Sequence, residues 1–218
     1  GDVGIRGDRI VTIAAPGALA DRQAINRIDA SGMVVSPGFI DIQSHSRFSF
    51  LGGGDGRVVS KVTMGVTTEI MGESTTNAPS SPQMLTNSGP AAGVSQFETF
   101  GEWIEAMEDH KASVNFGSFV GGSTIRVVGM GMAMGEAGDR ERRAMQQAVQ
   151  ESMEDGAFGI ATALVYPPGN FASTDELISI NEAMAPYGGV YITHLRSEAD
   201  NFLEAIDEAL EIGIQADV

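Results

Sequence analysis

The residues with the clearest chemical potential lie near the end of the chain, directly after a short apolar run. Residues 190–193 have the composition of a strand, and His194, Arg196 and Glu198 follow before a helical pattern begins. Parallel α/β folds carry their chemistry at the carboxyl ends of strands, so these polar side chains stand where a site is expected. A neutral imidazole fixed at such a position is a good zinc ligand. The alternative is a histidine that only caps its strand through a hydrogen bond.

The composition of the chain restricts its class and its partners. Its 218 residues are 42% hydrophobic and 19% charged, which is typical of a globular protein with a sizeable core. With 13 Lys plus Arg against 29 Asp plus Glu, the formal net charge is −16, so we expect neither nucleic acid nor an anionic membrane as a partner. No apolar stretch has the length of a membrane helix, and no targeting leader is recognisable. The absence of cysteine excludes disulfides and thiolate metal sites and fits a cytoplasmic protein.

The pattern of elements divides the chain near Pro37-Gly38. Residues 1–36 predict a small, incomplete β domain: a Gly-Asp turn leads into a strand within residues 4–14, and short strand signals follow at 25–29 and 33–35. The chain begins at a glycine without a methionine, so we expect that this is not the natural start.

Residues 37–218 alternate strands with helices. The predicted strands are residues 39–42, 66–71, 113–120, 157–165 and 190–193. The predicted helices cover residues 97–107, 139–153 and 173–185, and a last one runs through Phe202, Ile206 and Leu210. This alternation favours a parallel sheet wound by right-handed crossovers, with residues 75–96 as a long loop that covers a site.

The strand ends carry motifs of a known superfamily. Residues 37–45, Pro-Gly-Phe-Ile-Asp-Ile-Gln-Ser-His, resemble the PGFIDxHxH signature of amidohydrolases, which are metal-bearing (β/α)8 barrels fused to a small β-sandwich. Further motifs resemble the N-acyl-D-amino-acid deacylase, or D-aminoacylase, branch: residues 65–73, 122–126, 159–169 and 188–198. The resemblance implies an α/β fold in which residues 1–36 are part of the sandwich. Residues 37–218 would then be the first five βα units of a partial TIM-type barrel, an open sheet whose C-terminal part is missing.

The resemblance also implies a metal site. His194 corresponds to a metal-binding histidine of the family, and His45 corresponds to the second histidine of the HxH pair. Residues two apart on a strand face the same side, so the two side chains of such a pair can share a metal. Here Gln43 occupies the first position, and an amide is a poor zinc ligand. One tight zinc site is therefore expected, a second one is in question, and His45 either binds a metal weakly or only forms a hydrogen bond.

A second departure from the family lies after the strand at residues 66–71. D-aminoacylases commonly have a thiolate ligand there, and its position in this chain is Ser74, whose hydroxyl cannot replace an anionic ligand at neutral pH. The carboxylate of Glu73 can, so we predict Glu73 as the compensating ligand. The alternative is a glutamate that backbone amides hold in the loop.

The remaining implied roles concern substrate and catalysis. Tyr166 corresponds to a tyrosine that contacts the substrate carboxylate, and Arg196 is a weaker candidate for the same role, because structural salt bridges also occur at barrel mouths. Gly122 stands where the family's third-strand motif has a histidine. In the family, an aspartate late in the barrel is the general base; we expect it beyond Val218 and therefore no general base, and no activity, in these 218 residues.

The implied reaction is metal-dependent hydrolysis of a linear amide, with an acylated amino acid as the small-molecule substrate. Two alternatives stay open. A cyclic-amide hydrolase of the dihydroorotase or hydantoinase type would need a carboxylated lysine at a strand end, and the candidates are Lys61 and Lys111. A non-catalytic barrel with a degraded metal site would explain Gln43, Ser74 and Gly122 together.

Overall fold

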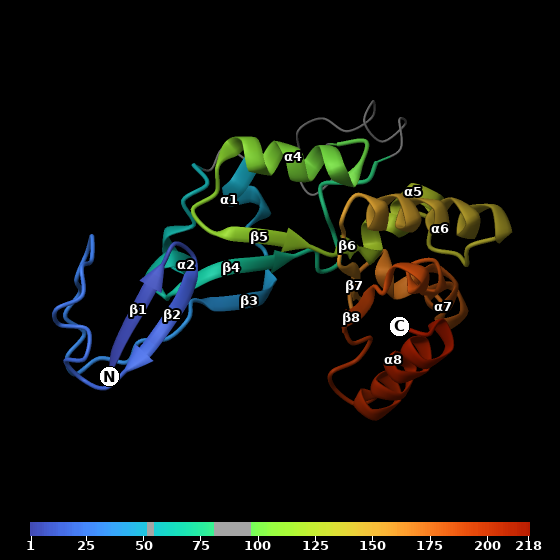
Figure 1. Ribbon diagram of the computed structural model, residues 1–218. Coiled ribbons are helices and arrows are strands. Elements are labelled where there is room, and N and C mark those ends of the chain that lie inside the picture. Colours follow the sequence, from blue (N-terminus) through green and yellow to red (C-terminus); the bar gives the residue numbers. More distant parts are fainter. Residues whose placement is uncertain (52–54, 81–96) are drawn as a thin grey trace. The chain divides into compact units, whose positions relative to one another are not determined.

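The computed structural model describes residues 1–51, 55–80 and 97–218, which form two compact units, Gly1–Pro37 and Gly38–Val218 (Figure 1). Most of the predicted loop at 75–96 lies outside the described residues. None of the described helices is both long and apolar enough to cross a membrane.

The first unit contains one antiparallel hairpin of strands β1 (Asp2–Arg6) and β2 (Arg9–Ala14). The turn between them forms at Gly7 and Asp8, where Gly7 has the positive φ of 60° that a side chain would disfavour.

The strands predicted at 25–29 and 33–35 are wrong, because neither segment is part of a strand. A strand is stable only when its backbone pairs with a neighbour and one face is buried. Ile28 and Val34 are 88% and 92% exposed, and the sheets of the described residues include neither segment.

The second unit contains two parallel three-stranded sheets in sequential order, β3-β4-β5 and β6-β7-β8. The strands are β3 (Phe39–Ser44), β4 (Val66–Met71), β5 (Asn115–Ser118), β6 (Val120–Gly121), β7 (Gly159–Ala163) and β8 (Val190–His194). The five predicted strands are confirmed, and the third is interrupted at Phe119, which separates β5 from β6. The amide of Phe119 donates to the carbonyl of Met71 at 2.9 Å, so the chain passes from one sheet to the other beside the end of β4.

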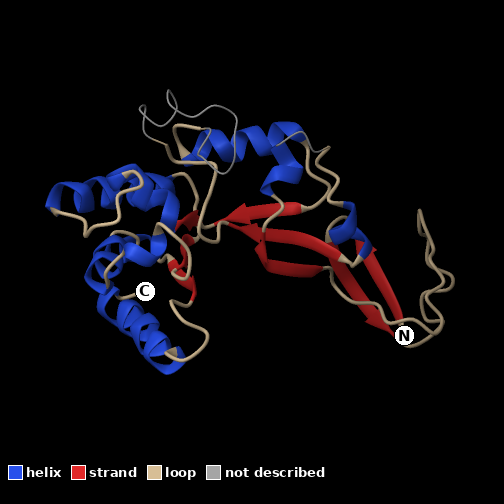
Figure 2. Cartoon of the chain, turned by 180° about the vertical axis from the view of Figure 1, so that it is seen from behind, coloured by secondary structure: helices blue, strands red, loops and turns tan. Residues whose placement is uncertain are grey.

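Helices connect these strands as in a barrel of βα units (Figures 1 and 2). They are α1 (Arg47–Leu51), α2 (Val59–Thr63), α4 (Phe100–His110), α5 (Gly122–Met130), α6 (Asp139–Glu154), α7 (Thr174–Glu182) and α8 (Phe202–Ala216), with 3-10 turns η1 (Gly169–Phe171) and η2 (Ala185–Tyr187). Both views show α4 along the sheet β3-β4-β5 and helices α5 to α8 beside strands β6 to β8. The four predicted helices are confirmed, whereas α1, α2 and α5 are not among the predicted ones, and the sequence motif indicated α5 only as a strand exit.

Local chemistry explains where these helices begin. Thr99 and Glu102 form a reciprocal capping box at the start of α4. At α7, the hydroxyl of Ser173 accepts from the amide of Glu176, as the sequence pattern predicts. Helix α6 has Gly138 as its N-cap, so Asp139 lies in the first turn, where its carboxylate is favoured by the helix dipole.

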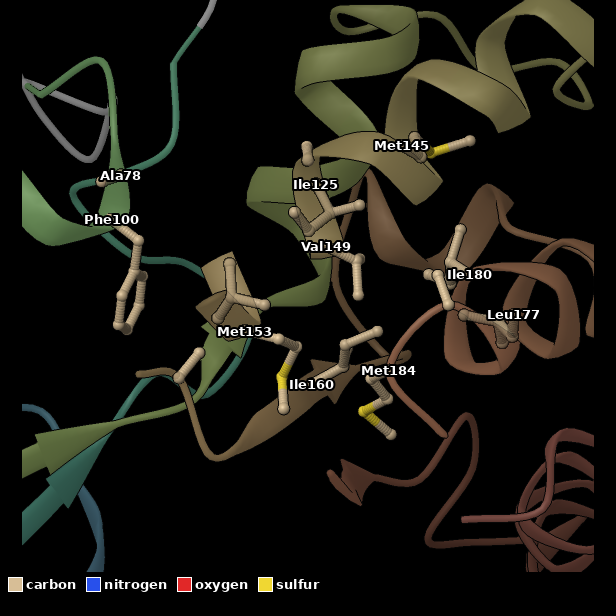
Figure 3. Packing of buried hydrophobic residues seen from close by; sticks show 14 of the residues in the cluster. Ala78, Phe100, Ile125, Met145, Val149, Met153, Ile160, Leu177, Ile180 and Met184 are labelled. Atoms are coloured by element: carbon tan, nitrogen blue, oxygen red, sulfur yellow. The ribbon is translucent and has the colours of Figure 1, made fainter. Parts of the chain in front are cut away.

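A methionine-rich core fixes the second half of this unit (Figure 3). Helix α6 buries Met145, Val149 and Met153 on one face, as its spacing predicts. Ile160 of β7 and Met184 after α7 are fully buried in the same cluster. This packing holds helices α5 to α7 against β7 and so sets the direction of the neighbouring strand β8, which ends in His194.

Candidate metal centre

The carboxylate of Glu73 lies between side chains that come from the ends of two other strands. Glu73 follows β4, His45 follows the adjacent strand β3, and His194 is the last residue of β8. Oε2 of Glu73 is 2.8 Å from Nε2 of His45, and Oε1 of Glu73 accepts a hydrogen bond of 2.7 Å from Nε2 of Gln43. Nδ1 of His194 is 3.9 Å from Oε1 of Glu73. The three predicted ligands, His45, Glu73 and His194, therefore come together around one carboxylate.

The backbone after β4 explains how Glu73 reaches β8, which belongs to the other sheet. The amide of Ser74 donates to the carbonyl of Ala161 in β7, at 3.1 Å. Two residues further along β7, Ala163 is in register with His194 of the next strand, β8. This hydrogen bond places the end of β4 beside the carboxyl ends of β7 and β8.

Ser74 itself is directed elsewhere. Its backbone has a φ of 61°, and its Oγ is 3.1 Å from Oγ of Ser123 in the first turn of α5. Its carbonyl accepts from the amide of Ser123 at 2.8 Å. Of the two neighbours, Glu73 contacts the histidines and Ser74 joins β4 to α5.

His194 has a second carboxylate partner and an aromatic neighbour. Its Nε2 is 2.9 Å from Oε1 of Glu198, and its side chain is 27% exposed. The ring of Tyr166 lies beside it, with the ring centroids 5.7 Å apart and the planes inclined by 58°. Tyr166 is 55% exposed, so its phenol faces solvent next to the imidazole. A small molecule bound next to His194 would therefore also contact Tyr166.

The guanidinium of Arg196 binds within the protein. Its Nε and one terminal nitrogen each donate to the carboxylate of Glu208 at 2.8 Å. The remaining hydrogen bonds go to the carbonyls of Asn170, at 3.0 Å, and Ala172, at 2.9 Å. The hydrogen bond with Glu208 raises the pKa of Arg196 above its ordinary value. The geometry matches the structural salt bridge that was the alternative for this residue, and a substrate role for it stays a prediction.

Gly122 has no room for the histidine that the family motif places there. A Cβ at Gly122 would lie 2.5 Å from Cγ2 of Thr162, well inside van der Waals contact. The glycine lets the first turn of α5 approach β7 closely, and the departure from the family is thus explained by packing.

The donor types around Glu73 fit zinc, which prefers imidazole nitrogen and carboxylate oxygen in this setting. Across residues 1–51, 55–80 and 97–218, however, no three His, Cys, Asp or Glu side chains are already grouped so that they could hold an ion. In the structure His45, Glu73 and His194 are linked through the carboxylate by direct contacts. Binding of a metal there would require His45 to exchange its hydrogen bond with Glu73 for the metal.

No protein-family model matches the chain, but individual proteins are similar to it over its whole length. The chain is 37% identical over 225 residues to D-aminoacylase of Alcaligenes xylosoxydans xylosoxydans and 38% identical over 223 residues to the N-acyl-D-aspartate deacylase of the same organism. Both matches cover 100% of this chain and 45% and 44% of those proteins, so the chain spans a little less than half their length. The chain is a homologue of the N-acyl-D-amino-acid deacylases.

Solved structures of such deacylases share its fold. The crystal structure of D-aminoacylase, described as defining a novel subset of amidohydrolases, superposes with a TM-score of 0.86 at 36% identity over 99% of this chain and 45% of that one. N-acyl-D-glutamate deacylase from Bordetella bronchiseptica, in complex with zinc and a phosphonate mimic of the tetrahedral intermediate, gives 0.84 at 29% identity, covering 97% and 44%. The predicted fold class, part of an amidohydrolase barrel of the TIM type, is confirmed.

Two contacts of this deacylase homologue were not predicted from its sequence. The hydrogen bond from Gln43 to Glu73 joins residues 30 positions apart, and only the pairing of β3 with β4 brings them together. Glu198 is four residues after His194, a spacing that was visible in the sequence as a polar cluster without an assigned role. The lysines of the cyclic-amide alternative are placed away from strand ends, Lys61 within α2 and Lys111 at the C-cap of α4.

Proposed function

We propose that the protein carrying this sequence hydrolyses the amide bond of N-acyl-D-amino acids at a zinc site formed by His45, Glu73 and His194. The observation that carries the proposal is the contact of one carboxylate, Glu73, with histidines from two different strands, in a homologue of deacylases. Relatives give independent support: one homologous deacylase is known in complex with zinc, and D-aminoacylase has a binuclear metal centre. We propose one tight zinc here, since Gln43 offers an amide where an imidazole would be needed for a second.

Each residue has a distinct part in the proposed chemistry. A bound zinc would polarise the acyl carbonyl and lower the pKa of a water molecule. His194, whose other nitrogen is held by Glu198, has a fixed ring orientation, as metal-binding imidazoles require. The exposed phenol of Tyr166 is proposed to donate to the carboxylate of the substrate. Arg196 is proposed to hold α8 and η1 beside the site through its present partners. A role in substrate binding would require a substrate to displace those partners.

The domain organisation follows as part of the proposal. We assign residues 1–36 to a small β domain and residues 37–218 to the first βα units of the barrel. The contacts of Glu73, His45 and His194 all lie within the second of these parts, so the proposed zinc site belongs to the barrel.

The test compares two neighbouring residues that the structure separates. In the full-length protein, Glu73→Ala should abolish stoichiometric zinc, measured by elemental analysis after dialysis, together with release of free D-amino acid from its acetyl derivative. Ser74→Ala should keep zinc, because Ser74 contacts Ser123 and not the histidines. If Ser74→Ala lost zinc and Glu73→Ala retained it, Ser74 and not Glu73 would be the ligand, and the proposal would be wrong.

A non-catalytic barrel is the second candidate, because Gln43 and Ser74 both depart from the ligands of the family. The same experiment separates the two candidates. Absence of near-stoichiometric zinc and of deacylase activity in the unmodified full-length protein favours the non-catalytic barrel.

A further inference from the structure

The side chain of Gln43 has an unusual position for a residue that replaces a metal ligand. It lies near the end of β3, is exposed to solvent, and its Nε2 is 2.7 Å from Oε1 of Glu73. A carboxylate can only accept hydrogen bonds, so the amide must present its NH2 group to Glu73. The other carboxylate oxygen, Oε2, contacts His45.

These two contacts restrict the rotation of the Glu73 carboxylate. One oxygen is held by Gln43 and the other by His45, and the side chain of Glu73 is only 11% exposed. The ion-pair partners of Glu73 within the described residues are both histidines, and neither lysine nor arginine is among them. A neutral amide therefore fixes the carboxylate without cancelling its negative charge, which a cationic partner would do.

We propose that Gln43 is a positioning residue that orients the carboxylate of Glu73 toward a metal ion. This inference rests on the proposed zinc site. Gln43 would thus contribute to the metal site without being a ligand: its amide acts through Glu73 and does not itself bind the ion. Partners that orient metal ligands in this way contribute substantially to affinity, and their loss typically weakens binding about 10- to 100-fold.

The test measures zinc affinity in the full-length protein, with zinc alone as the probe and a chromophoric chelator as competitor. Gln43→Met keeps the length and volume of the side chain but removes the donor, and we expect zinc to bind about 10- to 100-fold more weakly. Gln147→Met is the matched control, because Gln147 makes the same kind of exposed hydrogen bond, 2.8 Å to Glu151 on α6. Gln43→Asn is a second variant that withdraws the amide by one methylene group, and it should lose affinity to a similar degree.

The unfolding midpoint of the metal-free protein separates positioning from folding. Because Gln43 is exposed, we expect the metal-free midpoint to be the same in Gln43→Met, Gln147→Met and the parent protein. Unchanged zinc affinity in both Gln43 variants would overturn the inference while leaving the proposed function intact. A fall in affinity matched by a lower metal-free midpoint would also overturn it. A parent protein that binds no zinc would instead refute the proposed function itself.

Discussion

The clamp between Arg196 and Glu208 allows the structural and substrate-binding roles of Arg196 to be separated. Arg196→Met keeps the aliphatic stem and removes the guanidinium, which binds the Glu208 carboxylate through two nitrogens and also the carbonyls of Asn170 and Ala172. If the structural role is right, the variant should destabilise the fold whether or not substrate is present.

The contacts give the size of the effect. Side chains of Arg196 and Glu208 are 31% and 13% exposed, so the pair is neither fully buried nor freely solvated. Breaking a buried pair costs about 3–5 kcal/mol, and an exposed pair is worth less than about 1 kcal/mol. We therefore expect a loss of about 2 kcal/mol in the free energy of unfolding.

The pH dependence gives an independent signature. Burial alone would raise the pKa of Glu208, but hydrogen bonds from Arg196 and Thr174 outweigh it and lower that pKa below its ordinary value of 4.5. A carboxyl group with a lowered folded-state pKa contributes stability above its unfolded pKa and loses it as the pH falls through the folded value. The difference between the parent protein and Arg196→Met should therefore be largest near neutral pH and shrink below about pH 4.5.

The assay is urea unfolding of the full-length protein and its variants at pH 7 and pH 4. Arg196→Met, Glu208→Met and the double variant form a cycle, and a coupling free energy of about 1 kcal/mol or more is expected. Arg140→Met, which removes an exposed arginine on α6, is the control and should be nearly neutral. Additive effects, or an Arg196→Met variant as stable as the parent but with a raised KM, would refute the clamp and restore the substrate role.

Two further predictions concern backbone and buried charge. Gly159→Ala should lower the free energy of unfolding by about 3 kcal/mol or more, because the new Cβ would lie 2.0 Å from the carbonyl oxygen of Val190 at a φ of +140°. The control is Gly156→Ala, which should cost about 1 kcal/mol because the φ there is +97° but the space around the residue is open. Equal unfolding free energies of the two variants would contradict this reasoning. Arg126→Met should lower the free energy of unfolding by about 3–5 kcal/mol, because it leaves the carboxylate of Glu176 buried without its partner. The double variant Arg126→Met/Glu176→Met should recover much of this stability. A double variant less stable than Arg126→Met would contradict the reasoning.

The strands of the barrel were predictable because each is a short apolar run ended by glycine or a polar residue. Helix α5 was not, since Gly121-Gly122-Ser123 has the composition of a loop, and the need for glycine at position 122 arises from Thr162 in a strand 40 residues later. The apolar segments of the first unit had a strand pattern, but a pattern does not supply the neighbouring strand that makes a pair.

The site shows the same division between local and distant information. Strand-end position indicated His194, whereas His45 and Glu73 were selected through the resemblance to the D-aminoacylases. Which oxygen of Glu73 faces which partner was not predictable, because it depends on the pairing of β3 with β4 and on the hydrogen bond from Ser74 to Ala161.

The contacts link Gln43, which departs from the family signature, to Glu73 and leave Ser74 apart from both. The glutamate places its carboxylate beside His45 and His194, and Gln43 supplies the hydrogen bond that holds it there. Ser74 has no remaining part in that geometry, since its hydroxyl and both backbone groups bind Ser123 and Ala161. A histidine at position 43 would lack an amide that donates to Glu73 in the same direction, and a smaller residue at position 73 would leave Gln43 without its acceptor. Gln43 and Glu73 therefore form one arrangement, and replacing either of them alone should weaken the site.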